Sequence, residues 1–337
     1  MKLAYRIVEL RRKYPFTISG HTTVADNVIY ITLEHDGVIG YGEGCPGYYF
    51  SETLEDELKF LSKLKLEQFN NPTDIETILS YVDGVEAGHT AAKAGVDIAL
   101  HDLVGKLTGL PCYKLFNSDP AKMPETTLTI GMDTPDMIRK KVLEAEGFHL
   151  LKVKLGGDND KAIIETIRSV SDLPLTVDAN QGWHNKEEAL EMIHWLKERN
   201  TIFIEQPMPR EQRDNNAWIT EHSPLPTVGD EAVQRLADVD QAKGVYTGIN
   251  IKMVKCTGMH EGYKMILRAR ELGLKLMVGC MGESSVAILG AAAIAPQCDW
   301  VDLDSTWLIS NNPYKDPVLE NGKIILNDQP GLGLQQL

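Results

Sequence analysis

The chain has 337 residues, of which 43% are hydrophobic and 24% are charged, and its formal net charge is −14. These values are typical of a globular protein with one large and one smaller domain, and the acidic balance argues against nucleic acid or anionic membranes as partners. Five scattered cysteines without a C-x-x-C pair predict reduced thiols and a cytoplasmic protein, and no segment has the apolar length of a membrane span.

The first 120 residues predict an α+β domain. Residues 1 to about 50 have the composition of β-strands, and Asp36-Gly37 lies between two β-rich runs as a hairpin turn. Two helical patterns follow, one starting after a cap at Ser51 and one, rich in small residues, ending at Gly109. Strands followed by helices are the usual order of an α+β domain.

Residues 42–47 match the pattern G-x-G-x-x-G of dinucleotide-binding loops. Such a loop must pass directly from a strand into a helix. Here Pro46 and two tyrosines follow, and the preceding strand is half of a hairpin. We therefore do not assign a nucleotide-binding role to these glycines.

From Thr126 onward, short apolar runs alternate with helical patterns about every 25 residues. The runs are TTLTIG, HLLKVKLG, LPLTVDAN, TIFIEQP, LPTVGDE, TGINIKMVK, LKLMVGC and DWVDLDS. This alternation predicts parallel β-structure, and eight runs favour a (β/α) barrel, with a doubly wound sheet as the alternative. We expect a capping domain at 1–120, a barrel at 121–311, and a C-terminal segment at 312–337 that packs back on the capping domain.

Charged residues stand at the ends of most of these runs, where a barrel carries its catalytic groups. Asp178, Glu205 and Asp230 end three consecutive runs, so the three carboxylates should lie on one wall of the barrel. They would repel one another strongly without a cation among them. A site made only of oxygen ligands favours Mg²⁺, and Mn²⁺ is the second candidate.

Two lysines should flank this wall. Lys154 and Lys252 end the second and sixth runs, which lie opposite each other in a ring of eight strands. Burial and a nearby dication lower the pKa of a lysine, which can then act as a general base. Two bases facing one carbon could remove a proton from one side and return it on the other, through an enolate whose oxygens the metal holds.

The last run, WVDLDSTWLI, reads as a buried strand with two carboxylates on the same face. Asp302 and Asp304 are costly to bury together without a cationic partner. We expect the substrate to supply that cation; a salt bridge to a lysine or arginine of the protein is the alternative.

Together these residues resemble the enolase superfamily, in particular its muconate-lactonizing-enzyme subgroup. The matching stretches are KVKLG, VDANQGW, IEQP, GDE, NIKMVKCTG and GCMGES, with the hairpin GYGEGCP and the helix AGVDIALHDLVGK. The resemblance implies an α/β fold, a modified (β/α)7β TIM-like barrel with an N-terminal α+β capping domain. It implies Mg²⁺ ligands, two acid–base lysines and two neighbours of the metal site, which are Asp178, Glu205, Asp230, Lys154, Lys252, Asn180 and Glu231.

Within this subgroup, the pair of aspartates resembles the mark of dipeptide epimerases, in which two carboxylates bind the α-ammonium of a dipeptide. The resemblance implies an isomerase, expected as a homo-oligomer, that inverts the second residue of L-Ala-D/L-Glu or L-Ala-D/L-Xaa dipeptides derived from peptidoglycan. A cycloisomerase, an o-succinylbenzoate synthase, an N-acylamino acid racemase and a non-catalytic scaffold are the alternatives. The residues expected to contact substrate are Lys152, Asp302, Asp304, Thr129, His21, Met281 and Glu283.

One departure from the family pattern concerns the second residue of the substrate. Ala-Glu epimerases of this family carry an arginine in the capping-domain loop near residue 20, where it meets the glutamate side chain. Here the loop reads PFTISGHTTVAD, and His21 takes that place. Because histidine is only partly charged near neutral pH, acidic, small and apolar second residues all stay open.

Overall fold

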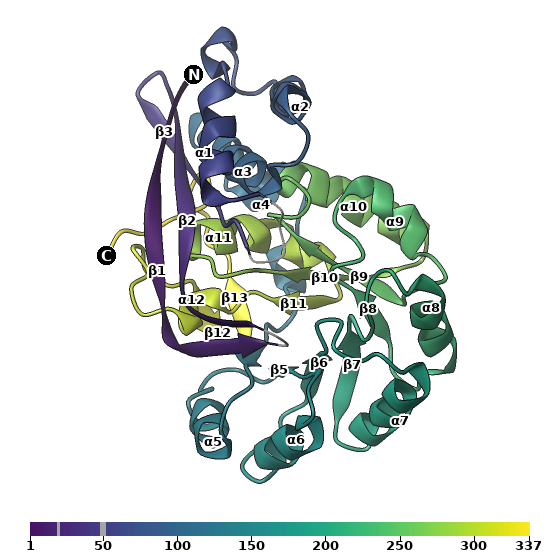
Figure 1. Cartoon of the computed structure of the whole chain (residues 1–337). Coiled ribbons are helices and arrows are strands. Elements are labelled where there is room, and N and C mark those ends of the chain that lie inside the picture. Colours follow the sequence, from purple (N-terminus) through teal and green to yellow (C-terminus); the bar gives the residue numbers. More distant parts are fainter. Residues whose placement is uncertain (19–20, 48–51) are drawn as a thin grey trace.

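The computed structural model describes residues 1–18, 21–47 and 52–337 (Figure 1). Its N-terminal part begins with an antiparallel sheet in the order β1-β2-β3. The strands are β1 (Lys2–Ile18), β2 (His21–His35) and β3 (Val38–Gly44). Asp36 and Gly37 join β2 to β3 with φ values of 50° and 77°. Positive φ at both turn positions is the geometry that the Asp-Gly pair favours, so the predicted hairpin is confirmed.

Helices then cover this sheet. They are α1 (Leu54–Lys63), η1 (Leu66–Gln68), α2 (Ile75–Val85), α3 (Thr90–Thr108), α4 (Cys112–Leu115) and η2 (Pro120–Lys122). Thr53 caps α1, because its hydroxyl accepts the Asp56 amide and the Asp56 carboxylate accepts the Thr53 amide. The predicted cap, Ser51, lies outside the described residues. Helix α3 ends at Gly109, whose φ is 70°, as expected.

Gly42 and Gly44 let β3 lie directly against α3. A Cβ atom on Gly42 would overlap the carbonyl oxygen of Gly95, and one on Gly44 would overlap that of Ala91. Only glycine permits so close an approach of two backbones. These positions therefore serve the packing of a strand on a helix.

Eight parallel strands follow in sequential order, with each strand hydrogen-bonded to the next. They are β4 (Leu128–Ile130), β5 (Leu151–Lys154), β6 (Leu175–Asp178), β7 (Thr201–Glu205), β8 (Thr227–Gly229), β9 (Gly248–Lys252), β10 (Lys275–Gly279) and β11 (Trp300–Asp302). A bridge between Thr126 and Val301 brings β11 beside the segment that leads into β4. This is the predicted barrel, because a doubly wound sheet would reverse its strand order.

Helices surround the barrel (Figure 1). They are α5 (Pro135–Leu143), α6 (Asp160–Arg168), α7 (Lys186–Lys197), α8 (Arg213–His222), α9 (Leu236–Ala242), α10 (Met259–Glu271), α11 (Ser285–Ile294), η3 (Ala295–Gln297) and α12 (Ser305–Leu308). Every residue of α11 is buried, and Gly290 of this helix packs against Ile98 of α3. The buried helix α11 thus joins the N-terminal helices to the barrel.

The predicted strand over residues 300–309 is wrong in its length. Strand β11 ends at Asp302, and α12 begins at Ser305. The Leu303 amide donates to the Thr126 hydroxyl, and Asp304 has helical φ and ψ values. The chain therefore leaves the sheet between the two aspartates, so strand alternation does not place Asp304.

The segment after residue 311 returns to the N-terminal helices, with β12 (Val318–Glu320) and β13 (Lys323–Ile325) as a short hairpin on the way. The buried carboxylate of Asp102, in α3, accepts the amides of Tyr41 (2.8 Å) and Leu332 (2.7 Å) and the Lys106 ammonium (2.6 Å). One side chain therefore holds the edge strand, the helix and the C-terminal segment together. The domain boundaries at residues 120 and 311 stay a prediction.

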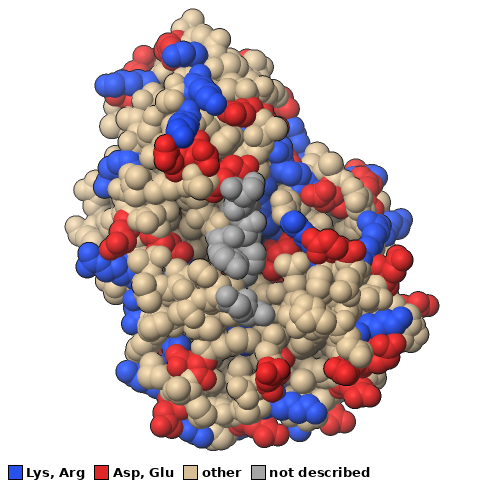
Figure 2. Space-filling model, in the orientation of Figure 1, with Lys and Arg blue, Asp and Glu red and all other residues tan. Residues whose placement is uncertain are grey.

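Acidic and basic side chains are interspersed over the face of the molecule in Figure 2. Within the described ranges, no helix has the length and apolar character needed to cross a membrane.

Candidate active site

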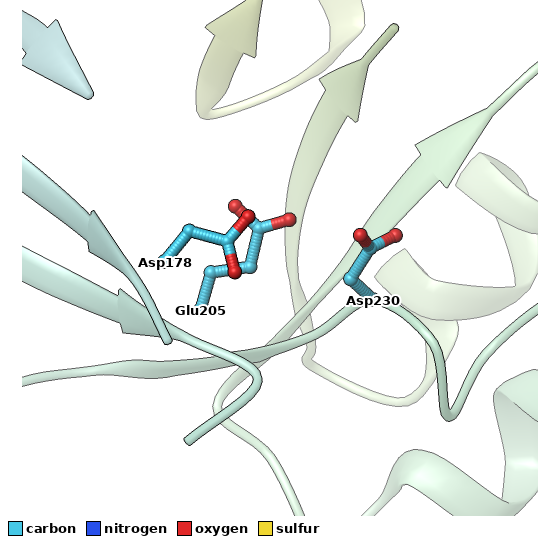
Figure 3. Close-up of side chains that lie close together, drawn as sticks. All are labelled: Asp178, Glu205 and Asp230. Carbon is cyan, nitrogen blue, oxygen red and sulfur yellow. The ribbon is translucent and has the colours of Figure 1, made fainter. Parts of the chain in front are cut away.

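Three buried carboxylates meet at the ends of neighbouring strands. Asp178 ends β6, Glu205 ends β7 and Asp230 directly follows β8. Each offers an oxygen within 4.8 Å of those of the other two, and none is more than 2% exposed. Figure 3 shows the carboxylate of Asp230 across a short gap from those of Asp178 and Glu205. The structure thus brings the predicted triad together.

The donor set fits a hard divalent cation. All three groups offer carboxylate oxygens, and no histidine or cysteine belongs to this cluster of described residues. Burial and the Asp178 carboxylate raise the pKa of Glu205 to about 7. Lys152 Nζ lies 2.7 Å from Glu205 Oε2 and 3.2 Å from Asp178 Oδ2, so a cation already balances part of this charge. Lys154, Lys252 and Lys255 also pair with the triad, so a divalent ion bound here would share the carboxylates with these ammonium groups.

The two predicted lysines flank the triad from opposite sides. Lys154 ends β5 and Lys252 ends β9, four strands away. Lys154 Nζ donates to Asp178 Oδ2 (2.6 Å), and Lys252 Nζ donates to Asp230 Oδ2 (2.7 Å). Burial favours a low pKa for Lys252, but the carboxylates of Asp230 and Glu205 outweigh it and hold the pKa above its ordinary value. The expected fall in this pKa therefore requires a cation that offsets those carboxylates.

Two polar residues that contact the triad were not predicted from the sequence. Lys255 Nζ is buried, pairs with the Asp230 carboxylate, and donates to the backbone oxygens of Val233 (2.9 Å) and Asn250 (2.8 Å). Asn250 Nδ2 donates to Glu205 Oε1 (2.7 Å). Both residues fix the orientation of triad carboxylates. The NIKMVK stretch contains both, but the sequence alone does not tell which polar residues of a strand end point inward.

Asp302 and Asp304 differ in their surroundings. Lys152 Nζ donates to Asp302 Oδ2 and Thr127 Oγ1 donates to Asp302 Oδ1, each over 2.7 Å. Asp304 accepts the Thr129 amide and forms no ion pair with a lysine or arginine of the described chain. Burial and the Asp302 charge raise the pKa of Asp304 to about 7. The protein itself thus supplies the cation for Asp302, which corrects the expectation, whereas Asp304 lacks one.

A cavity of about 450 Å³ lies between the mouth of the barrel on one side and strands β1 and β2 on the other. Most predicted site residues line it, namely Lys152, Lys154, Lys252, Asp302, Asp304, Thr129, His21, Met281 and Asn180. Glu283, Glu231 and the three carboxylates of the triad do not line it. Glu283 is buried and accepts the Met281 amide (2.9 Å), and Glu231 accepts from Asn180 Nδ2 (3.3 Å) beside the triad. Glu283 thus supports the cavity wall from behind.

The capping wall of the cavity contains a cation that the sequence analysis did not assign. Arg12 lies on β1 and Asp26 on β2; Arg12 Nε is 2.7 Å from Asp26 Oδ2, and both side chains line the cavity. The register between β1 and β2 shifts between Arg11 and Phe16. Because of this irregularity, strand alternation cannot tell which way Arg12 points.

Two family models match the chain. Residues 2–116 match the mandelate racemase/muconate lactonizing enzyme N-terminal domain, and residues 136–336 match the enolase C-terminal domain-like family. The first range covers the capping sheet and its helices through α4, and the second covers the barrel after β4 with nearly all of the C-terminal segment.

Similar proteins agree with these models. The L-Ala-D/L-Glu epimerase of Bacteroides thetaiotaomicron is 52% identical over 338 residues, covering 100% of this chain and 88% of that protein. The L-Ala-D/L-amino acid epimerase of Pedosphaera parvula is 36% identical, with 99% of each chain covered. A dipeptide epimerase from Enterococcus faecalis, solved with Mg and L-Leu-L-Tyr, superposes with a TM-score of 0.90 at 31% identity, over 99% of this chain and 98% of that one. With its buried carboxylate triad between two lysines, the chain belongs to the mandelate racemase/muconate lactonizing enzyme family of the enolase superfamily.

Proposed function

We propose that this protein is a dipeptide epimerase, an isomerase that inverts the α-carbon of the second residue of L-Ala-D/L-Glu dipeptides. One arrangement carries the proposal: Lys154 and Lys252, which pair with Asp178 and Asp230 of the triad, line one cavity together with Asp304, which pairs with no lysine or arginine among the described residues. A dipeptide has the matching polarity, with a carboxylate at one end and an ammonium at the other. The high identity to an L-Ala-D/L-Glu epimerase supports this substrate.

The site residues would orient the substrate by charge. The substrate carboxylate would lie toward the triad, next to the Lys152 ammonium, which is 1% exposed. The α-ammonium would lie at Asp304 and Asp302. The Lys152 ammonium neutralises part of the charge of Asp302. The substrate ammonium would therefore meet two carboxylates that together keep a net negative charge.

The two lysines would then exchange the α-proton. Lys154 Nζ removes the proton from one face of the α-carbon, and Lys252 Nζ delivers one to the opposite face, so the configuration inverts. The reverse reaction exchanges the two roles. Each lysine must be neutral to accept a proton and protonated to donate one. Before the reaction, one of the two lysines is therefore a neutral amine and the other is an ammonium.

We propose Asp178, Glu205 and Asp230 as the ligands of Mg²⁺, with Mn²⁺ as a substitute. When bound, the cation supplies positive charge that stabilises the enolate of the substrate carboxylate and offsets the carboxylates that now raise the pKa of Lys252. Lys255 and Asn250 hold two of the ligand carboxylates in place. Glu231 and Asn180 fill the space beside them.

The side chain of the second residue would meet the capping wall. Arg12 and His21 both line the cavity there, and the guanidinium of Arg12 suits a glutamate side chain. Asp26 accompanies Arg12 and lowers the net charge of this wall. An Arg12→Met variant should therefore lose more kcat/KM on Ala-Glu than on Ala-Ala, which has no second carboxylate on its side chain.

We also propose a cytoplasmic homo-oligomer that acts on dipeptides released from peptidoglycan. Its five cysteines are free, which suits a reducing compartment. Tyr5 and Ile7 of β1 are 37% and 46% exposed, so the capping sheet offers apolar surface to a second copy. Light scattering behind size-exclusion chromatography measures the mass and would give the monomer mass if the oligomer proposal is wrong.

Proton exchange tests the proposed reaction. In D₂O with Mg²⁺, the enzyme should incorporate deuterium at the α-carbon of the second residue of L-Ala-L-Glu and should form L-Ala-D-Glu. Mass spectrometry measures the first product and chiral chromatography the second. Exchange of an N-acylamino acid or turnover of muconate, without exchange of any dipeptide, would instead identify another reaction of this family.

A further inference from the structure

A second cavity adjoins the first beside Asp304. It has a volume of about 170 Å³ and lies between β1, the end of β4 and α12. Thr129 and Leu308 line both cavities, together with Arg12 and Phe16. Because Thr129 also donates its amide to Asp304, the boundary between the two cavities lies next to the proposed ammonium position.

The inner walls of this second cavity are apolar. They consist of Leu128, Ile130, Phe148, Trp307, Leu308 and Phe16. Trp307 packs edge-on against Phe148 with ring centroids 5.4 Å apart. Trp307 and Leu308 are only partly buried, although both are large and apolar. Partly covered apolar side chains around an internal cavity favour an apolar ligand over water.

The outer rim is polar and spanned by the capping domain. Tyr14 of β1 donates to the Glu144 carboxylate (2.9 Å), just after α5, and Lys141 lies 5.6 Å from the centre of the Tyr14 ring. The volume of about 170 Å³ exceeds the roughly 150 Å³ of a protein cavity that holds benzene, so a branched or aromatic side chain would fit.

The covalent structure of a dipeptide points to the occupant. In the first residue, the side chain and the ammonium are attached to the same α-carbon. An ammonium at Asp304 therefore places the first side chain near Thr129, whose amide binds Asp304. Thr129 and Leu308 line both cavities, so this side chain can extend from the first cavity into the second.

On the basis of the proposed function, we infer that the second cavity is the subsite for an apolar side chain on the first residue of the dipeptide, with Leu308 as its entrance. The isobutyl group of Leu308 limits the width of that entrance. Alanine needs none of this volume, whereas leucine or phenylalanine must pass Leu308 to use it.

The test compares Leu-Glu with Ala-Glu, which differ only in the first side chain. We expect Leu308→Ala to raise the ratio of kcat/KM for Leu-Glu over Ala-Glu by about tenfold or more. Leu308→Val should raise it less and serves if the alanine variant does not fold. Adding Leu128→Phe, which fills the cavity from its inner wall, should cancel the gain. Leu267→Ala, at an exposed position on α10, is the matched control and should leave the ratio unchanged.

Two results would count against the inference. An unchanged ratio in both Leu308 variants, with Ala-Glu still turned over, overturns the subsite while the proposed epimerase activity stands. A raised ratio that Leu128→Phe fails to cancel also overturns it, since the extra side chain would then lie elsewhere. Absence of exchange with every dipeptide in the wild-type enzyme would instead refute the proposed function.

Discussion

Asp304→Asn should separate ammonium binding from proton transfer. The substitution keeps the size of the side chain and an oxygen that accepts the Thr129 amide, but removes the charge, which forms no ion pair with a lysine or arginine in the described part of the chain. Removing one member of a buried charge pair costs about 2–5 kcal/mol. Asp302 stays in place with Lys152 at 2.7 Å, so we expect the lower part of this range. A loss of about 2–3 kcal/mol corresponds to about 30- to 150-fold in kcat/KM.

The loss should appear mainly in KM, because the ammonium interaction is the same in the ground state and the transition state. Propionyl-glutamate, which lacks the ammonium of Ala-Glu, completes a double-mutant cycle with the variant. We expect it to be a poor substrate of the wild-type enzyme and no worse a substrate of the variant. An Asp304→Asn enzyme with wild-type KM for Ala-Glu, or an equal further loss on propionyl-glutamate, would refute the assignment of the ammonium site.

The pH dependence of the same variant offers a second readout. Burial and Asp302 raise the pKa of Asp304 to about 7, so the folded protein keeps this proton well above the pH at which the unfolded chain loses it. Between about pH 4 and 7 the folded state binds more protons, and the contribution of Asp304 to stability falls as the pH rises. Asp304→Asn should therefore have a higher Tm than the wild type at pH 8. The KM of the wild type should fall as the pH rises and Asp304 ionises. The KM of the variant should not show this fall.

Further predictions concern the base pair, the metal and the packing of the capping domain. Lys154→Ala and Lys252→Ala should each lower epimerisation by about 10²–10⁴-fold while keeping deuterium exchange with one enantiomer, and full activity in both would contradict the two-base scheme. Chelation should abolish turnover, and added Mg²⁺ should restore it. At 100 times its Kd, Mg²⁺ should raise the free energy of unfolding by about 2.7 kcal/mol. An unchanged Tm on addition of Mg²⁺ would argue against a metal in the triad. Gly42→Ala should cost about 1–3 kcal/mol in urea unfolding because β3 must move away from α3, whereas the open position Gly84 should tolerate alanine in α2.

The barrel and the triad could be predicted because parallel strands impose a regular pattern. Each strand needs an apolar run, each return needs a helix, and the strand ends converge at one mouth. Asp178, Glu205 and Asp230 occupy equivalent positions in three such repeats, so their meeting follows from the repeat itself. The lysines on β5 and β9 follow from the same count, since four strands separate opposite sides of the ring.

The missed features depend on distances that no repeat determines. Lys152 contacts Asp302 because the barrel closes between β11 and the segment before β4. The distance between these two side chains depends on that closure and cannot be derived from their separation in the sequence. Arg12 enters the cavity at an irregularity of β1, where alternation no longer applies. Strand β11 is only three residues long and ends at Asp302, so Asp304 lies outside the sheet.

The carboxylate of Asp102 has a consequence for biosynthesis. Lys106 and Tyr41 lie in the capping region, but the partner amide at Leu332 lies 230 residues further along the chain, so the ribosome must complete the whole barrel before Asp102 has its third partner. Until then one hydrogen bond of this buried carboxylate is missing, and the capping region is less stable than in the finished protein. A nascent chain arrested within the barrel should accordingly display a protease-sensitive capping region. A deletion that removes Leu332 should do the same in the finished protein, at a distance from any catalytic group.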